Sequence, residues 1–237
     1  MAPVEAPMEQ RMEAMYLIGP SAAVWSVMYL IARYVLLSKW SSDYSNRAVS
    51  IVHAVLMIFL ATAASDWSDP IGEVGGSSTL FQMQVMAVSL GYFLYDVICC
   101  LIISDEWLMN LIHHSLTMSG LGIGVLKGVS GCELTLCLLM MEASNPFMHA
   151  RFMMKEAGVK DSAFALVNEV TFGVVFMLCR IILGPPLVYK TVVHPDAHLG
   201  VKAGALGIQI VSVIWFYKIA QVIAYKLSKK SKGKKKA

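Results

Sequence analysis

Residues 81–126 determine the predicted fold, because they form two apolar runs on either side of a short polar turn. They read FQMQVMAVSLGYFLYDVICC, then LIISDEWLMNLIHHSLTMSG, then LGIGVL. A run of about 20 mostly apolar residues can cross a bilayer as a helix, and Ser104-Asp105-Glu106 marks the turn. The runs are continuous and do not alternate in steps of two, which favours helices over barrel strands. We therefore expect a transmembrane helical hairpin here.

Similar apolar runs occur along the whole chain. Of its 237 residues, 57% are hydrophobic and only 15% are charged, whereas about 25% of the residues in a soluble domain are charged. The runs cover residues 16–37, 48–65, 81–103, 107–126, 132–153, 163–184 and 203–225. The sequence therefore predicts an all-α, polytopic transmembrane helix bundle with about seven spans. Pro185-Pro186 is expected to end the sixth run, and Pro146 to kink the fifth beside Glu142.

Lysine and arginine residues set the predicted orientation, because they concentrate in cytosolic loops. Thirteen of the 19 basic residues lie in the regions 33–47, 151–160 and 226–236, which share one side of a seven-span bundle. The C-terminus is therefore predicted in the cytosol and the N-terminus in the lumen. The predicted parts are a lumenal segment (1–15), a first span with its cytosolic loop (16–46), a transmembrane domain (47–227) and a basic cytosolic tail (228–237).

The tail also suggests a location and partners. It ends Lys234-Lys235-Lys236-Ala237, and lysines third and fourth from the end fit a KKxx retrieval signal for the endoplasmic reticulum, which a receptor reads. Its charge equally suits anionic lipid at the cytosolic leaflet. No globular basic domain accompanies it, so we expect no nucleic-acid partner. The sequence also allows a homo-oligomer.

Ionisable side chains inside the spans are the candidates for function, since a charge at the bilayer centre costs about 3 kcal/mol or more. Counting from the span ends places six of them at one depth in the cytosolic half, with Arg180 alone near the lumenal end. The six are Asp96, His113, His114, Glu142, Glu169 and Lys218. A shared depth predicts one water-accessible polar cavity. Alternatively, Glu169 only pairs with an Arg or Lys, and Lys218 extends to the interface.

The adjacent residues His113 and His114 carry the catalytic hypothesis. On a helix they point about 100° apart, and His113 shares a face with Thr117. One histidine could act as a base or an acyl acceptor, with Asp96 orienting it and Glu142 as a second acid/base group. Two buried histidines bonded to carbonyl groups are the plainer alternative. A His, Asp and Glu metal site ranks lower, because neighbouring histidines do not converge on one ion. We therefore predict neither a metal nor a cofactor, and we expect the five cysteines, none of which forms a CxxC pair, to be free buried thiols.

Three of these segments together resemble the TLC-domain family, which includes the ceramide synthases. They are Gly91-Tyr92-Phe93-Leu94-Tyr95-Asp96, the HHxxT pattern His113-His114-Ser115-Leu116-Thr117, and the group Glu142, Ser144, Pro146 and Phe147. The resemblance covers roughly residues 47–227. It implies a helical membrane domain around a lipid-accessible cavity, often in the endoplasmic reticulum, with a role in lipid homeostasis.

The resemblance also implies an alternative activity. In ceramide synthases the paired histidines, here His113 and His114, are needed to join an acyl chain from acyl-CoA to a sphingoid base. Those enzymes carry a His-Asp pair in the next span, where this chain reads Leu138-Leu139-Met140-Met141-Glu142. We therefore expect a protein that handles or senses membrane lipid in a cavity lined by Asp96, His113, His114 and Glu142. An N-acyltransferase that uses acyl-CoA and a long-chain amine is the alternative.

Overall fold

The computed structural model describes the backbone of residues 5–103 and 107–234, and the side chains up to residue 222. Apart from an isolated bridge between Ser77 and Val129, the regular elements in these ranges are helices. The predicted all-α class is therefore confirmed. The predicted turn at 104–106 and the final residues 235–237 of the predicted retrieval signal lie outside the described residues.

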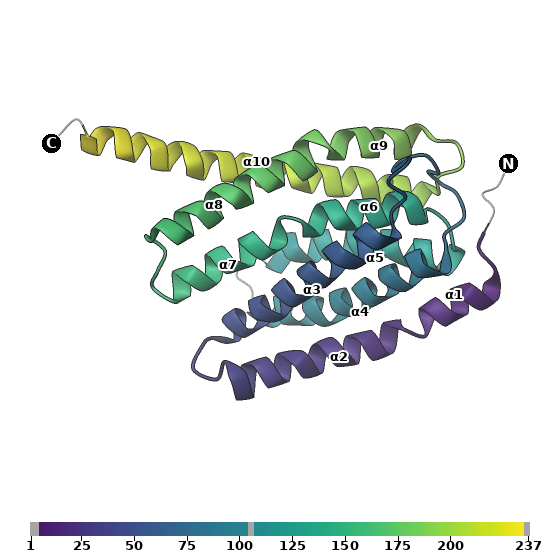
Figure 1. The fold of residues 1–237 in the computed structure, drawn as a ribbon, viewed down its shortest axis with the longest axis horizontal. Coiled ribbons are helices and arrows are strands. Elements are labelled where there is room, and N and C mark those ends of the chain that lie inside the picture. Colours follow the sequence, from purple (N-terminus) through teal and green to yellow (C-terminus); the bar gives the residue numbers. More distant parts are fainter. Residues whose placement is uncertain (1–4, 104–106, 235–237) are drawn as a thin grey trace.

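The helices form seven consecutive segments that run along one bundle axis (Figure 1). Several of these segments are interrupted or change helix type. In chain order they are α1 (Met8–Met15) with α2 (Ile18–Ile31) and the π-helix η1 (Ala32–Leu36); α3 (Ser42–Ala64); α4 (Leu80–Ile103); α5 (Trp107–Lys127); α6 (Gly131–Glu142) with α7 (Asn145–Glu156); α8 (Ala163–Phe176) with the π-helix η2 (Met177–Ile182) and α9 (Gly184–Val193); and α10 (Leu199–Lys234).

Within the described part of the chain, five helical segments are long and apolar enough to cross a membrane: Met8–Leu36, Ser42–Ala64, Leu80–Ile103, Ala163–Val193 and Leu199–Val222. The segment α5 is less apolar because it carries Asn110, His113 and His114, and α6 and α7 are each shorter than a span. Our prediction of about seven spans thus matches the number of helical segments, of which five have the length and composition of a span.

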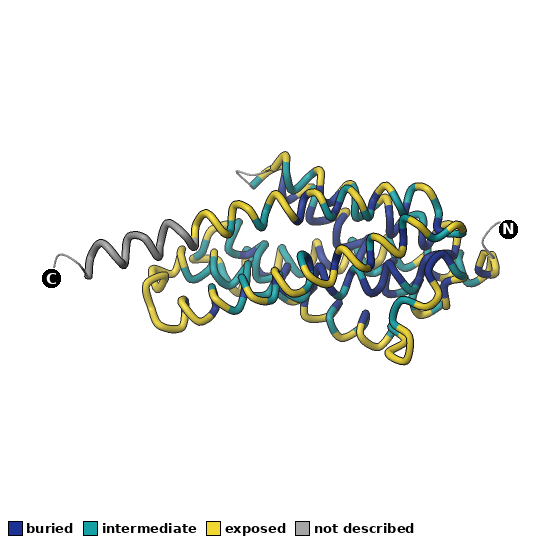
Figure 2. The backbone as a smooth tube through the Cα atoms, turned by 90° about the horizontal axis from the view of Figure 1, so that it is seen from above, coloured by how far each residue is buried: buried dark blue, intermediate teal, exposed yellow. Residues whose placement is uncertain are grey.

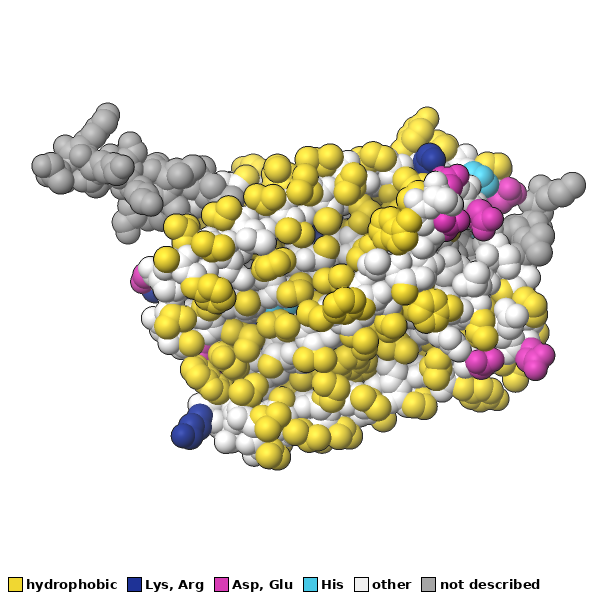
Figure 3. Space-filling view, viewed as in Figure 1, with side chains coloured by type: hydrophobic (Ala, Val, Ile, Leu, Met, Phe, Trp, Pro, Cys, Tyr) yellow, Lys and Arg dark blue, Asp and Glu magenta, His cyan; other side chains and the backbone are white. Residues whose placement is uncertain are grey.

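The surface supports an integral membrane protein. Figure 3 shows hydrophobic side chains across the middle of one face and charged side chains near its two ends. Large apolar side chains such as Phe59, Phe164 and Ile102 are more than half exposed, and Figure 2 shows exposed positions along the whole outer side of the bundle. A water-soluble surface seldom carries such an extended apolar area, so hydrocarbon is the natural surrounding.

The basic regions meet at one end of the bundle, as predicted. Ser41, in the α2–α3 connection, donates from its backbone N–H (2.9 Å) and its hydroxyl (2.7 Å) to the carboxylate of Glu156, at the end of α7. The C-terminal part of α10 projects from the same end (Figure 1). We call this the basic end; its assignment to the cytosol stays a prediction. The helix α10 continues through residue 228, so the predicted tail begins inside it.

The opposite end is closed by backbone contacts between the 66–79 connection, the α5–α6 turn and the N-terminal segment. The Gly128 carbonyl accepts from the backbone N–H groups of Ala6 (3.0 Å) and Ser78 (2.9 Å). Gly128 has a φ of 63°, and a Cβ there would lie 2.5 Å from the Ala6 side chain. This turn therefore requires glycine.

One predicted helix end is confirmed only in part, because η2 ends at Ile182 but a further helix follows directly. Pro185 and Pro186 were expected to end the sixth span, but they lie in the first turn of α9, and the helical segment continues to Val193. Proline is tolerated in the first turn of a helix because the backbone N–H it lacks there has no partner within the helix anyway.

Candidate functional site

A narrow apolar slot lies between α4, α5, α6, α9 and α10. Its volume is about 70 Å³. Its walls include Leu116, Leu121, Leu134, Leu187 and Ile208, and its polar groups include His113, Thr117, Glu133, Glu142, Thr191 and Gln209. The slot is therefore narrow and mostly apolar.

His113 and Thr117 both line the slot, as their predicted shared helix face requires. The His113 ring is buried, and its centroid lies 5.0 Å from that of Trp215 on α10. Its Nδ1 has no hydrogen-bond partner within the described part of the chain. His113 is therefore a buried imidazole in the slot wall, and its Nδ1 is a polar atom without a hydrogen bond among the described residues.

Glu142 lies at the predicted kink. The helix α6 ends at Glu142 and α7 begins at Asn145, with Pro146 in its first turn, so the kink is confirmed. The Glu142 side chain is only 3% exposed, and its Oε2 accepts a 2.9 Å hydrogen bond from the Asn145 side-chain amide. The kink therefore brings a buried carboxyl group to the slot beside an amide that holds it.

Arg180 lies beside the other buried ionisable groups, so the prediction that it lies alone near the lumenal end of its span is wrong. It is 2% exposed, and its Nη2 donates to the Met141 carbonyl (2.6 Å) and to the Asn145 side-chain oxygen (3.2 Å). Asn145 thus links Arg180 to Glu142. Because the helical segment runs on to Val193, Arg180 lies well inside it and not at its end. A buried cation therefore accompanies the buried acid.

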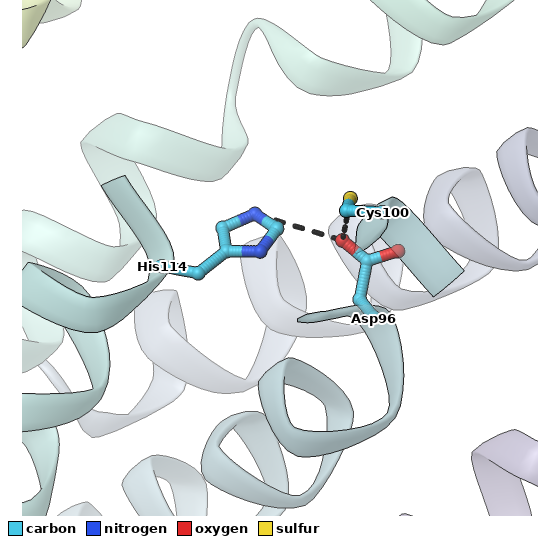
Figure 4. Close-up of side chains that lie close together, drawn as sticks. All are labelled: Asp96, Cys100 and His114. Atoms are coloured by element: carbon cyan, nitrogen blue, oxygen red, sulfur yellow. Dashed lines mark hydrogen bonds and ion pairs between the residues drawn. The ribbon is translucent and has the colours of Figure 1, made fainter. Parts of the chain in front are cut away.

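Asp96 and His114 form a second group beside the slot and are not among its lining residues. The His114 Nε2 lies 3.6 Å from the Asp96 Oδ2, and the Cys100 thiol lies 3.7 Å from the same oxygen (Figure 4). The expected pairing of Asp96 with a histidine thus involves His114. The predicted single cavity with four lining residues is divided: His113 and Glu142 line the slot, and Asp96 and His114 face one another.

His53 on α3 was missed by sequence reasoning. Its ring stacks on Tyr92 with centroids 3.6 Å apart, its Nε2 lies 3.3 Å from the Ser89 hydroxyl, and its Nδ1 lies 3.9 Å from the Glu142 Oε2. The other candidates were selected because they are ionisable side chains inside a predicted span. His53 lies within the apolar run 48–65 and meets this criterion, so its position in the sequence was enough to identify it as a candidate.

The remaining two candidates do not join the interior groups. Glu169 forms a 3.1 Å ion pair with Arg151, which confirms the alternative that it pairs with a basic residue. Lys218 is exposed on α10. Among the described residues, the interior candidates therefore form two groups: the slot with His113 and Glu142, and the neighbouring cluster of Asp96, Cys100 and His114.

Comparison with known proteins places the chain in a family. A family model described as the TLC domain matches residues 43–221. The chain belongs to the TLC-domain family. It is 26% identical to TLC domain-containing protein 4-B of Danio rerio over 212 residues, which is 82% of this chain and 78% of that protein. No solved structure matches it.

Other TLC-domain relatives match a smaller part. The chain is 25% identical to TLC domain-containing protein 2 of Danio rerio over 55% of this chain and 52% of that protein. It is 26% identical to human TLC domain-containing protein 1 over 58% of this chain and 57% of that protein. This chain thus spans only about half the length of these two relatives.

The TLC domain contains both interior groups. It begins in the first turn of α3, close to the predicted start at residue 47, and ends within α10. The segment Met8–Leu36 lies outside it, yet α2 packs closely on α4: a Cβ on Gly91 would lie 2.5 Å from the Ser21 side chain. This additional segment covers the outer side of α4, away from the slot.

Proposed function

We propose that this TLC-domain protein holds a membrane lipid, with an acyl chain in the apolar slot, and thereby handles or senses lipid in the service of membrane lipid homeostasis. The slot carries the proposal, because it combines apolar walls with polar groups at His113 and Glu142. It is narrow, which suits one hydrocarbon chain, and it lies between helices, where pockets of helical bundles commonly occur.

The polar groups would decide which lipid is held. Lipid tails are as apolar as leucine side chains, so moving an acyl chain from bilayer to slot gains little free energy. A hydrogen bond in an apolar site contributes more to selection, because a ligand that lacks its partner leaves the buried polar group unpaired. His113 Nδ1 has no partner within the described residues. A lipid with a polar group near the start of its chain fits this arrangement.

The proposed location is the endoplasmic reticulum with the basic end in the cytosol. The grouping of the basic regions at one end of the bundle supports this orientation. The terminal Lys234-Lys235-Lys236-Ala237 supports retrieval to that compartment by a receptor, and the lysines equally suit anionic lipid of the cytosolic leaflet.

A second candidate is N-acyl transfer, which His113 in the slot wall favours, because its Nδ1 has no hydrogen-bond partner among the described residues. The C–S bond of acyl-CoA would break as the acyl group moves to the imidazole and the coenzyme A thiol leaves with a proton. A long-chain amine would then take the acyl group, forming an amide and restoring His113. With a sphingoid base as the amine, the product would be a ceramide.

The test fills the slot without touching its polar groups. A Cβ on Gly204, on the α10 wall, would make ordinary van der Waals contact with the Leu116 carbonyl oxygen at 3.6 Å, so Gly204→Leu adds a side chain to the slot wall without a backbone clash at the Cβ. Gly19→Leu is the matched control, because a Cβ there meets nothing within 4 Å and Gly19 is an exposed residue of α2 that does not line the slot. Full-length variants in nanodiscs would be analysed by mass spectrometry of co-purified lipid.

We expect a defined lipid with the wild type and with Gly19→Leu, and at least a tenfold loss with folded Gly204→Leu. Equal lipid in all three proteins would overturn binding in the slot. Isotope-labelled acyl-CoA and a mixed lipid extract, added to the same samples, separate the two candidates. A labelled amide that His113→Ala abolishes would establish acyl transfer, whereas bound lipid without any product would establish lipid holding alone.

A further inference from the structure

The cluster of Asp96, Cys100 and His114 has a use that the slot does not explain. None of the three side chains lines the slot, and all three are buried or nearly so. One ligand atom from each lies within 4.8 Å of the others (Figure 4). We propose that these residues bind a divalent transition-metal ion of the zinc type.

The two distances from Asp96 Oδ2 to the other donors are close to those between ligands of one ion, and the third pair of donors lies within 4.8 Å. Zinc lies about 2.3 Å from sulfur and about 2.0–2.1 Å from nitrogen or oxygen in tetrahedral sites. Two donors of such a site are therefore roughly 3.3–3.6 Å apart. The Asp96 Oδ2 lies 3.6 Å from His114 Nε2 and 3.7 Å from Cys100 Sγ. The first distance is too long for a good N–H···O hydrogen bond, but both are close to the spacing around an ion.

The helices present the three donors to one point. Asp96 and Cys100 are four residues apart on α4, so they share a helix face, and His114 reaches them from α5 (Figure 4). From the sequence we predicted no metal, because the side chains of the two neighbouring histidines point in different directions and cannot bind one ion together. That reasoning does not apply to this cluster, which uses only one of them and takes a thiol as another donor.

A supporting shell of hydrogen bonds holds the carboxylate. The side-chain amide of Asn46 donates to Asp96 Oδ1 at 2.9 Å, and the Tyr95 hydroxyl donates to the amide oxygen of Asn46. The outer oxygen of Asp96 is thus occupied, and Oδ2 is directed to Cys100 and His114. Metal-binding carboxylates in proteins are commonly oriented by such outer partners.

Charge balance also favours a divalent ion. Asp96 is 5% exposed in a span, where an uncompensated carboxylate is costly. A carboxylate and a thiolate together neutralise a divalent cation, and a neutral imidazole completes three ligands. Three protein ligands leave a fourth position for water or for an oxygen of a bound lipid, as in open zinc sites.

The test measures metal directly. Full-length protein carrying no histidine tag would be purified in nanodiscs without chelators, and its metal content measured by inductively coupled plasma mass spectrometry before and after equilibration with Zn²⁺. Cys100→Ser is the decisive variant. Cys99→Ser is the matched control, because Cys99 is the neighbouring buried thiol but does not belong to the cluster.

We expect near-stoichiometric zinc in the wild type and in Cys99→Ser, and at least a tenfold lower content in Cys100→Ser and Asp96→Asn. Co²⁺ bound in place of zinc should give a thiolate charge-transfer absorption that disappears in Cys100→Ser. Added Zn²⁺ should also raise the Tm of the wild type, a readout that does not depend on the folding of a variant.

Either of two results would overturn the site: wild type that takes up no zinc and shows no Tm shift, or equal zinc in Cys100→Ser and Cys99→Ser. The proposal stands apart from lipid binding in the slot. Gly204→Leu should lose its lipid and retain its zinc. A variant that loses lipid but retains zinc has a defect in the slot alone. A variant that retains lipid but loses zinc has a defect in the cluster alone.

Discussion

The buried pair of Arg180 and Glu142 allows a quantitative prediction about stability. Arg180 donates to the Met141 carbonyl and to Asn145, and the Asn145 amide donates to Glu142. Arg180 also interacts electrostatically with Glu142. Removing one partner of a buried charge pair costs about 3–5 kcal/mol, because the other charge is left uncompensated. We therefore expect Arg180→Met to lower the free energy of unfolding by about 3 kcal/mol or more.

The sharper expectation concerns the double variant. If Arg180→Met is damaging mainly because it leaves Glu142 charged and buried, adding Glu142→Gln should restore part of the lost stability. In the wild-type background the same Glu142→Gln change should lower stability, because Arg180 then loses its counter-charge. A change that is harmful alone and helpful beside Arg180→Met indicates a coupled pair.

Equilibrium unfolding in mixed detergent micelles, followed by tryptophan fluorescence, would give the four free energies. Lys218→Met is the control, because it removes an exposed cation from α10, and exposed ion pairs contribute only about 0–1 kcal/mol. Strictly additive effects of Arg180→Met and Glu142→Gln would refute the coupling. An Arg180→Met variant as stable as Lys218→Met would refute the structural role of the guanidinium group.

Two further predictions concern packing and orientation. Gly91→Ala should destabilise the protein by about 1–3 kcal/mol, because the new Cβ would lie 2.5 Å from the Ser21 side chain, whereas Gly19→Ala, with nothing within 4 Å, should be nearly neutral in the same unfolding assay. A glycosylation acceptor inserted into residues 66–76 should be modified in microsomes, whereas one inserted at Gly158 should not. Modification would be detected as a mass shift that a glycosidase removes. The reverse pattern would show that the predicted topology is inverted.

The helical hairpin was predictable because its geometry follows from counting residues. A helix rises 1.5 Å per residue, so residues equally far from a turn lie at one level on the two helices. This reasoning correctly brought Asp96 to a histidine, and the structure identifies that histidine as His114. Composition likewise predicted the helical membrane class, since apolar runs of this length have few other folds available.

Arg180 could not be placed by the same counting. We took Pro185-Pro186 as the end of a span and measured depth from there, but α9 begins at Gly184 and extends the helical segment to Val193. The π-helix η2 contains Arg180, and such a segment has no distinct residue pattern. A Gln209 side chain that donates to the Arg180 carbonyl at 3.1 Å helps to hold this irregular turn, and only tertiary structure reveals that contact.

The two neighbouring histidines have different surroundings, and this changes how their motif should be read. Because adjacent helical residues point about 100° apart, His113 faces the slot and His114 faces Asp96. A double alanine variant would therefore disturb two groups at once and could not distinguish them. If the proposals are correct, His113→Ala should reduce bound lipid and keep the zinc, whereas His114→Ala should reduce zinc and keep the lipid. The same loss of both ligands in each single variant would mean that the slot and the cluster act as one site.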